Sequence, residues 1–176
     1  MKKLQLLPVG NPDERLLEWL RQALADKFHV PAQVLAPALD PALALHAERQ
    51  QFHSSEILRA VQKHINKDTW RLLAITDRDL YIPILTFVFG EAQIGGPAAI
   101  VSYRRLTQQY YGLPPDLDLL ANRLLIECVH ELGHTLHLTH CQEYRCAMAA
   151  SHAVEYIDIK DSGFCEECLA KATLTV

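Results

Sequence analysis

The feature that most constrains this chain is the clustering of its cysteines and histidines toward the C-terminal end. All 5 cysteines lie in one stretch, as Cys128, Cys141, Cys146, Cys165 and Cys168. The same stretch holds the histidines His130, His134, His137, His140 and His152, out of 9 in the chain. In a reducing compartment, thiols and imidazoles gathered in this way bind metal more often than they form disulfides. We therefore expect this part of the chain to be organised around metal ions.

The composition is that of an ordinary globular protein. The chain has 176 residues, of which 49% are hydrophobic, so it can bury a sizeable core and is not intrinsically disordered. The formal net charge of -4 gives no basic footprint for nucleic acid. No apolar run approaches the roughly 20 residues that span a bilayer, and Pro8 and Gly10 interrupt the start before a signal-peptide core forms. We expect a cytoplasmic protein with no nucleic-acid or membrane partner, and the sequence leaves the oligomeric state open.

Hydrophobic periodicity predicts strands and helices in alternation before the metal-rich segment. Strands are expected over residues 4–9, 30–35, 70–76, 84–90 and 98–103. Helices are expected over residues 12–28, 54–65 and from about 117 past 134. From residue 140 onward the chain is expected to be loop-like until a short helix after Cys165.

This order predicts the α/β fold class. We expect a single domain over residues 1–176, an α/β layer with a metal-rich tail. Residues 1–137 would form an N-terminal subdomain. Residues 138–176 would follow as a small zinc-bound C-terminal subdomain.

The sequence His130-Glu131-Leu132-Gly133-His134 falls within the helix predicted after residue 117. Histidines four residues apart share one face of a helix, about 6 Å apart along the axis, and can bind one zinc ion at about 2.0–2.1 Å from each nitrogen. Glu131 can take a proton from zinc-bound water, so we expect it to be the general base. Glu127, one turn earlier, is expected to be a solvated helix acid.

His140 is the expected third ligand. It can reach the ion only if the helix stops after about residue 136 and the chain folds back, which requires a left-handed residue near position 137. His137 is the alternative ligand, since it shares the helix face of His134. It would lie about 10.5 Å along the axis from His130, too far to converge on one ion. Three histidines leave one position for water and substrate, as in catalytic zinc sites.

Two pairs of cysteines follow, Cys141 with Cys146 and Cys165 with Cys168. Four thiolates from two such pairs can form a closed tetrahedral zinc site with bonds of about 2.3 Å. Two disulfides are disfavoured in a chain without an export signal, and a redox-active Cys-x-x-Cys lacks its usual βαβ context. We therefore expect a second, structural zinc ion here, and a buried apolar role for Cys128.

These motifs resemble those of the archaemetzincins, a branch of the metzincin zinc peptidases. The resemblance rests on His130-Glu131-x-x-His134-x5-His140, Cys141-x4-Cys146-x-Met148 and Cys165-x-x-Cys168, and on residues 76–81 and 87–92 upstream. It covers about residues 70–168 well and the N-terminal third by element order only. It implies a metzincin-like fold, with a mixed twisted sheet, a backing helix and an active-site helix. It also implies zinc-dependent peptide hydrolysis, a structural zinc on the four cysteines and a Met-turn at Met148 beneath the catalytic metal. The chain departs from the family at His137, where metzincins have glycine.

The expected function is hydrolysis of a peptide or protein substrate by a zinc-activated water, with Glu131 as the base and two zinc ions per chain. The resemblance to metzincins places an extended substrate along an edge strand, for which residues 98–103 are the candidate. The loop from Met148 to about Val154 would form a wall of the pocket for the residue after the cut. Individual substrate-binding residues are not identified by the sequence.

Two alternatives belong to other functional classes. A catalytically silent, zinc-stabilised peptide-binding module would keep the same residues, and only an assay separates it from a narrow peptidase. A zinc endoribonuclease can carry His-x3-His-x5-His, but it lacks glutamate after the first histidine, and a net charge of -4 is wrong for an RNA binder. Glu131 therefore favours the peptidase.

Overall fold

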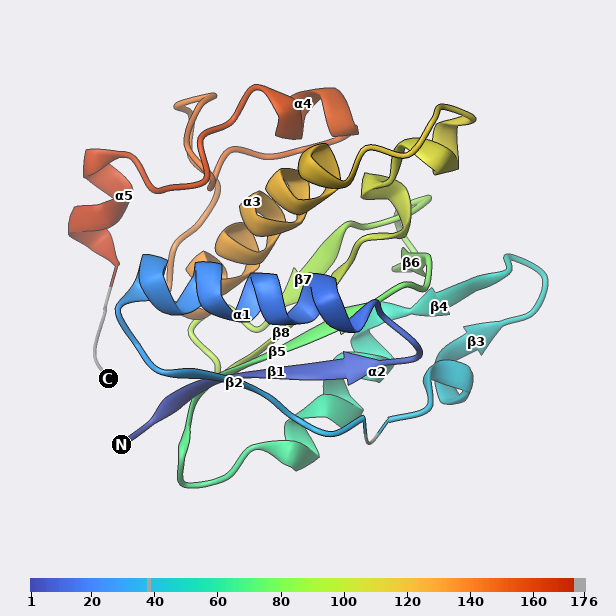
Figure 1. The fold of residues 1–176 in the computed structure, drawn as a ribbon, viewed down its shortest axis with the longest axis horizontal. Coiled ribbons are helices and arrows are strands. Elements are labelled where there is room, and N and C mark those ends of the chain that lie inside the picture. Colours follow the sequence, from blue (N-terminus) through green and yellow to red (C-terminus); the bar gives the residue numbers. More distant parts are fainter. Residues whose placement is uncertain (38, 173–176) are drawn as a thin grey trace.

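A five-stranded sheet forms the centre of the molecule (Figure 1). The computed structural model describes residues 1–37 and 39–172. The strands are β1 (Lys3–Val9), β2 (Ala32–Val34), β5 (Thr69–Thr76), β7 (Gly90–Ala92) and β8 (Ala98–Ser102). They lie in the order β2-β1-β5-β8-β7, with β7 antiparallel to β8 and the other neighbours parallel. The sheet is therefore mixed, as the sequence predicted.

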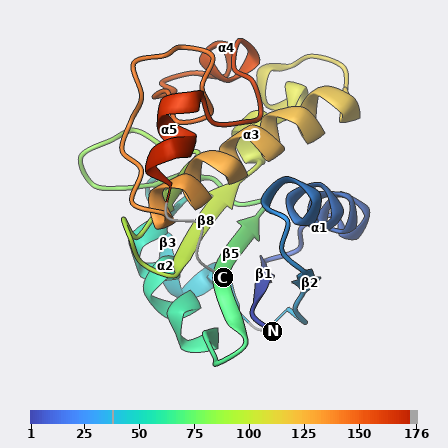
Figure 2. The same ribbon diagram turned by 90° about the vertical axis from the view of Figure 1, so that its left-hand side faces the viewer.

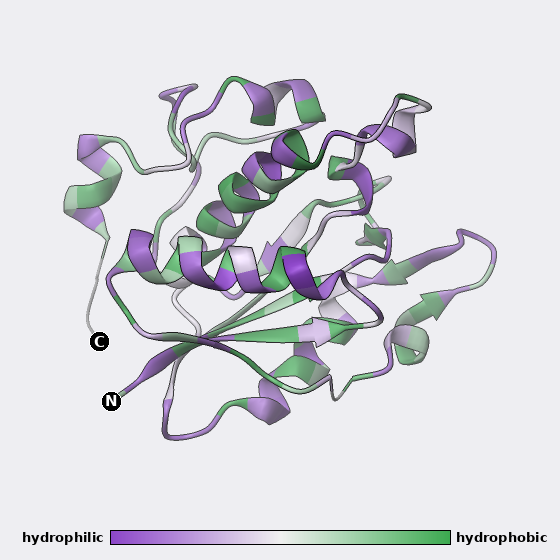
Figure 3. Ribbon diagram, viewed as in Figure 1, coloured by the Kyte–Doolittle hydropathy of each residue, from purple (hydrophilic) through white to green (hydrophobic). Residues whose placement is uncertain are grey.

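Helices cover both faces of this sheet (Figures 1 and 2). Helices α1 (Glu14–Phe28) and α3 (Leu117–Thr135) pack on one face, and α2 (Ser54–Val61) packs on the other. Successive residues of a strand point to opposite faces, so Leu73 joins the core under α1 and α3 while Leu72 joins the core over α2. Figure 3 shows that the central strands are predominantly hydrophobic, as expected for strands buried on both sides.

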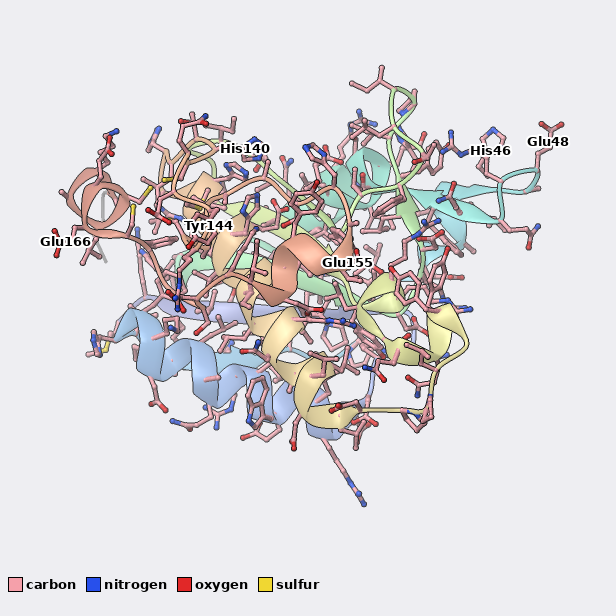
Figure 4. All side chains as sticks on the ribbon, turned by 90° about the horizontal axis from the view of Figure 1, so that it is seen from above. His46, Glu48, His140, Tyr144, Glu155 and Glu166 are labelled. Atoms are coloured by element: carbon pink, nitrogen blue, oxygen red, sulfur yellow. The ribbon has the colours of Figure 1, made fainter. Side chains whose placement is uncertain are left out.

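A small second sheet lies beside the main one. It consists of β3 (Leu45–His46), β4 (Gln51–His53) and β6 (Leu80–Tyr81), in the order β3-β4-β6. The β3–β4 hairpin, which carries His46 and Glu48, extends away from the body of the molecule (Figure 4). Elsewhere in the described residues, short 3-10 helices lie at Pro41–Ala44, Gln62–His64, Arg104–Leu106 and Gln108–Tyr111.

The described residues after α3, 136–172, are mostly coil with two short helices, α4 (Val154–Asp158) and α5 (Glu166–Lys171). The sequence predicted α5 but missed α4, whose five residues are too few to show a helical period. Within the described residues, no helix has the length and apolar character that crossing a bilayer requires.

The strand predicted over residues 84–90 is wrong. Most of this segment is an irregular loop, and only its last residue, Gly90, begins the short strand β7. Ile84 is 85% exposed and Leu85 is 49% exposed, so their apolar character does not report a buried strand. The helix predicted over residues 54–65 continues past Val61 as a 3-10 turn.

Candidate active site

Helix α3 carries His130, Glu131 and His134. Its start is set by Asp116, whose side chain accepts a hydrogen bond from the Leu119 amide at 2.9 Å and so caps the N-terminus. Most of the second half of the helix is buried against the sheet and the C-terminal coil, and His130 is 6% exposed. The two histidines and the glutamate are therefore held on a rigid element.

The end of α3 turns the chain back toward these histidines. The Leu138 amide donates to the carbonyl of Gly133 at 3.0 Å, and the His137 amide donates to the carbonyl of His134 at 3.1 Å. This pair of bonds is a Schellman motif, which needs a residue in the left-handed region after the helix. His137 is that residue, with φ of 67°. The reversal predicted near position 137 is confirmed, and the His137 side chain is exposed.

The turn brings His140 to the two helical histidines. The ring centroids of His130 and His134 are 4.7 Å apart, and that of His140 lies 5.3 and 5.2 Å from them. One nitrogen from each ring lies within 4.8 Å of the other two. His137 does not belong to this group. Figure 4 labels His140 on the coil that follows α3, which also carries Tyr144.

Backbone carbonyls determine which imidazole nitrogens are free. Nδ1 of His130 lies 2.7 Å from the Ala147 oxygen, and Nδ1 of His134 lies 2.8 Å from the Leu138 oxygen. A carbonyl only accepts, so each Nδ1 carries the proton and each Nε2 keeps its lone pair. The two Nε2 atoms are 3.1 Å apart. Tetrahedral ligands at 2.0–2.1 Å from one ion are separated by about 3.3 Å, so this arrangement fits zinc.

Burial also keeps these histidines uncharged. It lowers the pKa of His130 to about 3, and it lowers the pKa values of His134 and His140 as well. Only a neutral imidazole has a lone pair to offer to a metal ion. The three side chains are therefore in the protonation state that metal binding requires at neutral pH.

Glu131 packs against the edge strand of the sheet. A Cβ atom on Gly90 would lie 2.7 Å from both Cγ and Oε1 of Glu131, so the absence of a side chain there makes room for the carboxyl group. Burial raises the pKa of Glu131 well above its usual value, and the nearby charges of Glu127 and Glu91 raise it further. Glu91, the next residue of β7, accepts a hydrogen bond from the Ser55 hydroxyl at 2.8 Å.

A cleft of about 690 Å³ opens in front of the three histidines. The cleft is lined by residues 82 and 85–89 of the loop before β7, by β7 itself, by residues 150–152 and by the α3 side chains Glu127 and Glu131. β7 is the outer strand of the sheet, whereas β8 lies between β5 and β7. The expectation that residues 98–103 form the edge strand is therefore wrong, because the short strand β7 intervenes.

The four predicted cysteines also come together. The sulfur atoms of Cys141, Cys146, Cys165 and Cys168 lie within 4.8 Å of one another, and no disulfide forms among the five cysteines. Sγ of Cys141 and Sγ of Cys165 are 3.8 Å apart, close to the roughly 3.8 Å edge of a zinc tetrahedron with 2.3 Å bonds. The amides of Met148 and Cys165 point at Sγ of Cys146 from 3.4 and 3.3 Å. This donor set fits a closed metal site.

Met148 joins this cluster to the active-site helix. The Met148 side chain is fully buried. A Cβ atom on Gly133 would lie only 2.3 Å from the Met148 sulfur. Gly133 therefore permits the close approach of Met148 to α3. Cys128, in contrast, is fully buried in the main apolar core, as predicted.

The prediction that Glu127 is a solvated acid is wrong. It is 3% exposed, and its Oε1 lies 3.7 Å from Nζ of Lys160, which the sequence did not single out. Glu127 lies four residues before Glu131 on the same helix face, and this spacing was the sequence signal that Glu127 lies near the site. Tertiary packing alone brings Lys160, Glu91 and Gly90 to the site. His152, for which the sequence indicated no role, lines the cleft.

The comparison with known families agrees with this geometry. The family model of Peptidase family M54 matches residues 16–173. The chain belongs to peptidase family M54. It is accordingly a zinc metallopeptidase, a hydrolase that acts on peptide bonds. The archaemetzincin of Methanocaldococcus jannaschii is 37% identical over 170 residues, covering 96% of this chain and 92% of the relative. That of Archaeoglobus fulgidus is 36% identical, covering 96% and 98%.

Solved structures of similar proteins share the fold. The structure of Archaeoglobus fulgidus archaemetzincin complexed with malonate has a TM-score of 0.83 at 34% identity, over 96% of this chain and 99% of that one. A zinc-dependent peptidase from Methanocorpusculum labreanum has a TM-score of 0.84 at 26% identity, over 98% and 100%. The metzincin-like α/β fold expected from the sequence is confirmed.

Proposed function

We propose that His130, His134 and His140 hold the catalytic zinc ion of this M54 peptidase. The observation that carries the proposal is the meeting of the His130 and His134 Nε2 atoms at 3.1 Å, with both Nδ1 protons directed to backbone carbonyls. Two lone pairs at that distance repel each other unless a cation lies between them. His140 supplies a third nitrogen, and the cleft leaves the remaining side open to a substrate.

Glu131 is the general base in this proposal. When bound, zinc supplies a Lewis acid that polarises the scissile carbonyl and lowers the pKa of water. The carboxylate of Glu131 takes the proton of the attacking water and passes it to the nitrogen of the leaving amine. Its burial raises the affinity of the carboxylate for the proton, and the glycine at position 90 leaves room for the side chain. The same packing restricts its rotamers, which orients the oxygens.

The second zinc ion of the proposal is structural and is held by Cys141, Cys146, Cys165 and Cys168. Four thiolates fill a tetrahedron and leave no position for a substrate. Met148, two residues after Cys146, packs under the catalytic helix at Gly133 as the Met-turn. Because Cys141 follows His140 directly, the closed site braces the peptide unit that presents the third histidine. The reduced thiols that this site needs favour a cytoplasmic location.

A peptide substrate would lie extended along β7. β7 is the outermost strand of the sheet and its residues line the cleft, so an extended chain could add backbone hydrogen bonds to it. The segment after Met148, with Ala150, Ser151 and His152, lines the same cleft and would contact the residue after the cut. The division into an N-terminal part of residues 1–137 and a zinc-bound part beyond it belongs to the same proposal.

Glu131→Ala tests the mechanism. We expect both zinc ions and the fold to be retained, while hydrolysis of a broad peptide library falls by about two orders of magnitude or more. Glu155→Ala, an exposed acid on α4 labelled in Figure 4, is the matched control and should keep wild-type activity. Zinc content is measured in each variant. Wild-type rates in Glu131→Ala would refute Glu131 as the base.

The same assay addresses the silent binding module. A zinc-loaded wild type that binds peptides without cleaving any of the library would favour that alternative over the proposed turnover. The endoribonuclease is disfavoured by the M54 family match as well as by the presence of Glu131.

A further inference from the structure

Lys160 is a buried cation that lies behind the proposed catalytic zinc site. It follows α4, and its side chain is 1% exposed. Its ammonium nitrogen lies 3.3 Å from the carbonyl oxygen of Ala147 and 3.7 Å from Oε1 of Glu127. Burying an ammonium group is unfavourable unless its partners compensate.

The carbonyl oxygen of Ala147 accepts hydrogen bonds from two donors. It accepts the proton of Nδ1 of His130 at 2.7 Å as well as the bond from Lys160. A carbonyl oxygen has two lone pairs, so both bonds can form at once. Ala147 itself lies in coil between Cys146 and Met148, where no helix or strand ladder holds its carbonyl in place. Lys160 supplies a side-chain restraint on that carbonyl.

The ammonium group joins three segments that are distant in sequence. Ala147 lies in the coil that carries Cys146 and Met148. Glu127 and His130 belong to α3, and Lys160 lies two residues after the end of α4. Glu127 also receives a weak contact from the Ser151 hydroxyl at 3.5 Å. Burial lowers the pKa of Lys160 and raises that of Glu127, as expected for a pair whose partners compensate each other only in part. A well-packed apolar pair would stabilise this place as well or better.

We propose that Lys160 is a positioning residue for His130. Its ammonium group, anchored by the carboxylate of Glu127, holds the Ala147 carbonyl where that oxygen accepts the Nδ1 proton of His130. The imidazole is thereby kept in one tautomer and one orientation, with Nε2 directed at the metal. This inference rests on the proposed role of His130 as a zinc ligand.

The test measures zinc affinity at the three-histidine site of the full chain by competition with a chelator, with the four-cysteine site as an internal reference. Lys160→Met removes the ammonium group and keeps most of the stem. Lys160→Met/Glu127→Gln also removes the carboxylate that would otherwise be left unpaired. Lys27→Met is the matched control, because Lys27 is exposed and its Nζ donates to the Ser162 hydroxyl at 3.1 Å.

We expect zinc affinity at the histidine site to fall about 10- to 100-fold in both Lys160 variants, the usual effect of losing a partner of a metal ligand. Affinity at the cysteine site and in Lys27→Met should stay unchanged. The Nδ1 proton of His130, followed by NMR in the zinc-loaded protein, should exchange with solvent faster in both Lys160 variants. If Lys160→Met does not fold, the double variant decides the question, because it has no unpaired carboxylate.

Wild-type affinity in the double variant would overturn the inference, since Lys160 would then only neutralise Glu127. An unchanged exchange rate of the His130 proton would overturn it as well. A wild-type chain that binds zinc at the cysteines alone would refute the proposed function, and with it this inference. The two failures are therefore distinguished by the zinc content of the wild type.

Discussion

The regions before and after the end of α3 are built in different ways. Residues 1–137 bury large apolar clusters on both faces of a sheet, between long helices. Residues 138–172 contain two short helices and a small cluster of Leu138, Cys146, Met148 and Cys168. Half of that cluster is cysteine. The second region packs onto the main core mainly through Ala147, Val154 and Ile157.

This difference in regular structure and apolar burial indicates that the two regions are stabilised in different ways. Apolar burial contributes about 25 cal/mol per Å² and suffices for the first region, which has strands and helices to bury. The second region has too little regular structure for that, so in our proposal zinc contributes instead, with apparent binding free energies of about 10 kcal/mol or more. The proposed catalytic ligands come from both regions, His130 and His134 from the first and His140 from the second.

The largest effect should come from Cys165→Ser. Loss of a thiolate removes most of the zinc binding that orders residues 138–172, so we expect a fall in unfolding free energy of several kcal/mol and cleavage of this region in limited proteolysis. Cys128→Ala is the control from the first region. It deletes a small buried side chain and should cost about 1 kcal/mol. Equal thermal shifts of the two variants would contradict the different origins of stability.

His140→Ala should empty the three-histidine site and abolish hydrolysis while the cysteine site stays filled. The reason is that two histidines hold zinc much less tightly than three. Elemental analysis should give one zinc per chain, against two in the wild type. In a chelator titration of the wild type, the open histidine site should empty before the closed cysteine site. Retention of both ions in His140→Ala would refute this ligand set.

Gly90→Ala should disturb the base without removing either metal. The added Cβ would lie 2.7 Å from the Glu131 side chain and 2.7 Å from the Ile100 carbonyl, a backbone atom that cannot yield easily. We expect a loss of about 1–3 kcal/mol in unfolding free energy and a more than tenfold loss of activity. Gly163→Ala is the control, because its nearest atom would be Nζ of Lys27 at 3.9 Å. Unchanged activity in Gly90→Ala would show that Glu131 tolerates displacement.

The smallest effect should come from His137→Gly, at the boundary of the two regions. Glycine relieves the strain of a φ of 67°, but it adds entropy to the unfolded chain and loses the contact of the imidazole with Gly95. These effects offset each other, so the unfolding free energy should change by less than about 1 kcal/mol. Zinc titration should give wild-type affinity at the histidine site. Loss of that metal would reassign His137 as a ligand.

Features that depend on nearby residues were predicted correctly, whereas features that depend on contacts between distant segments were not. The strand at β1, the helices α1 and α3, and the turn at His137 were predicted because they depend on nearby residues and caps. The strand over residues 84–90 was predicted wrongly because exposed apolar residues of the cleft loop imitate a buried strand. Glu127 was misjudged because its buried partner, Lys160, is far away in sequence.

By itself, the sequence determined which side chains can supply nitrogen and sulfur ligands and a carboxylate base, and that the chain reverses after α3. A spacing of four residues on a helix and closely spaced cysteine pairs are local features, so they can be recognised from the sequence without knowledge of the fold. Only the tertiary structure decided that β7 forms the cleft edge, that Gly90 makes room for Glu131, and that Lys160 and His130 meet at one carbonyl. Those arrangements depend on packing between segments far apart in the chain, which no local pattern records.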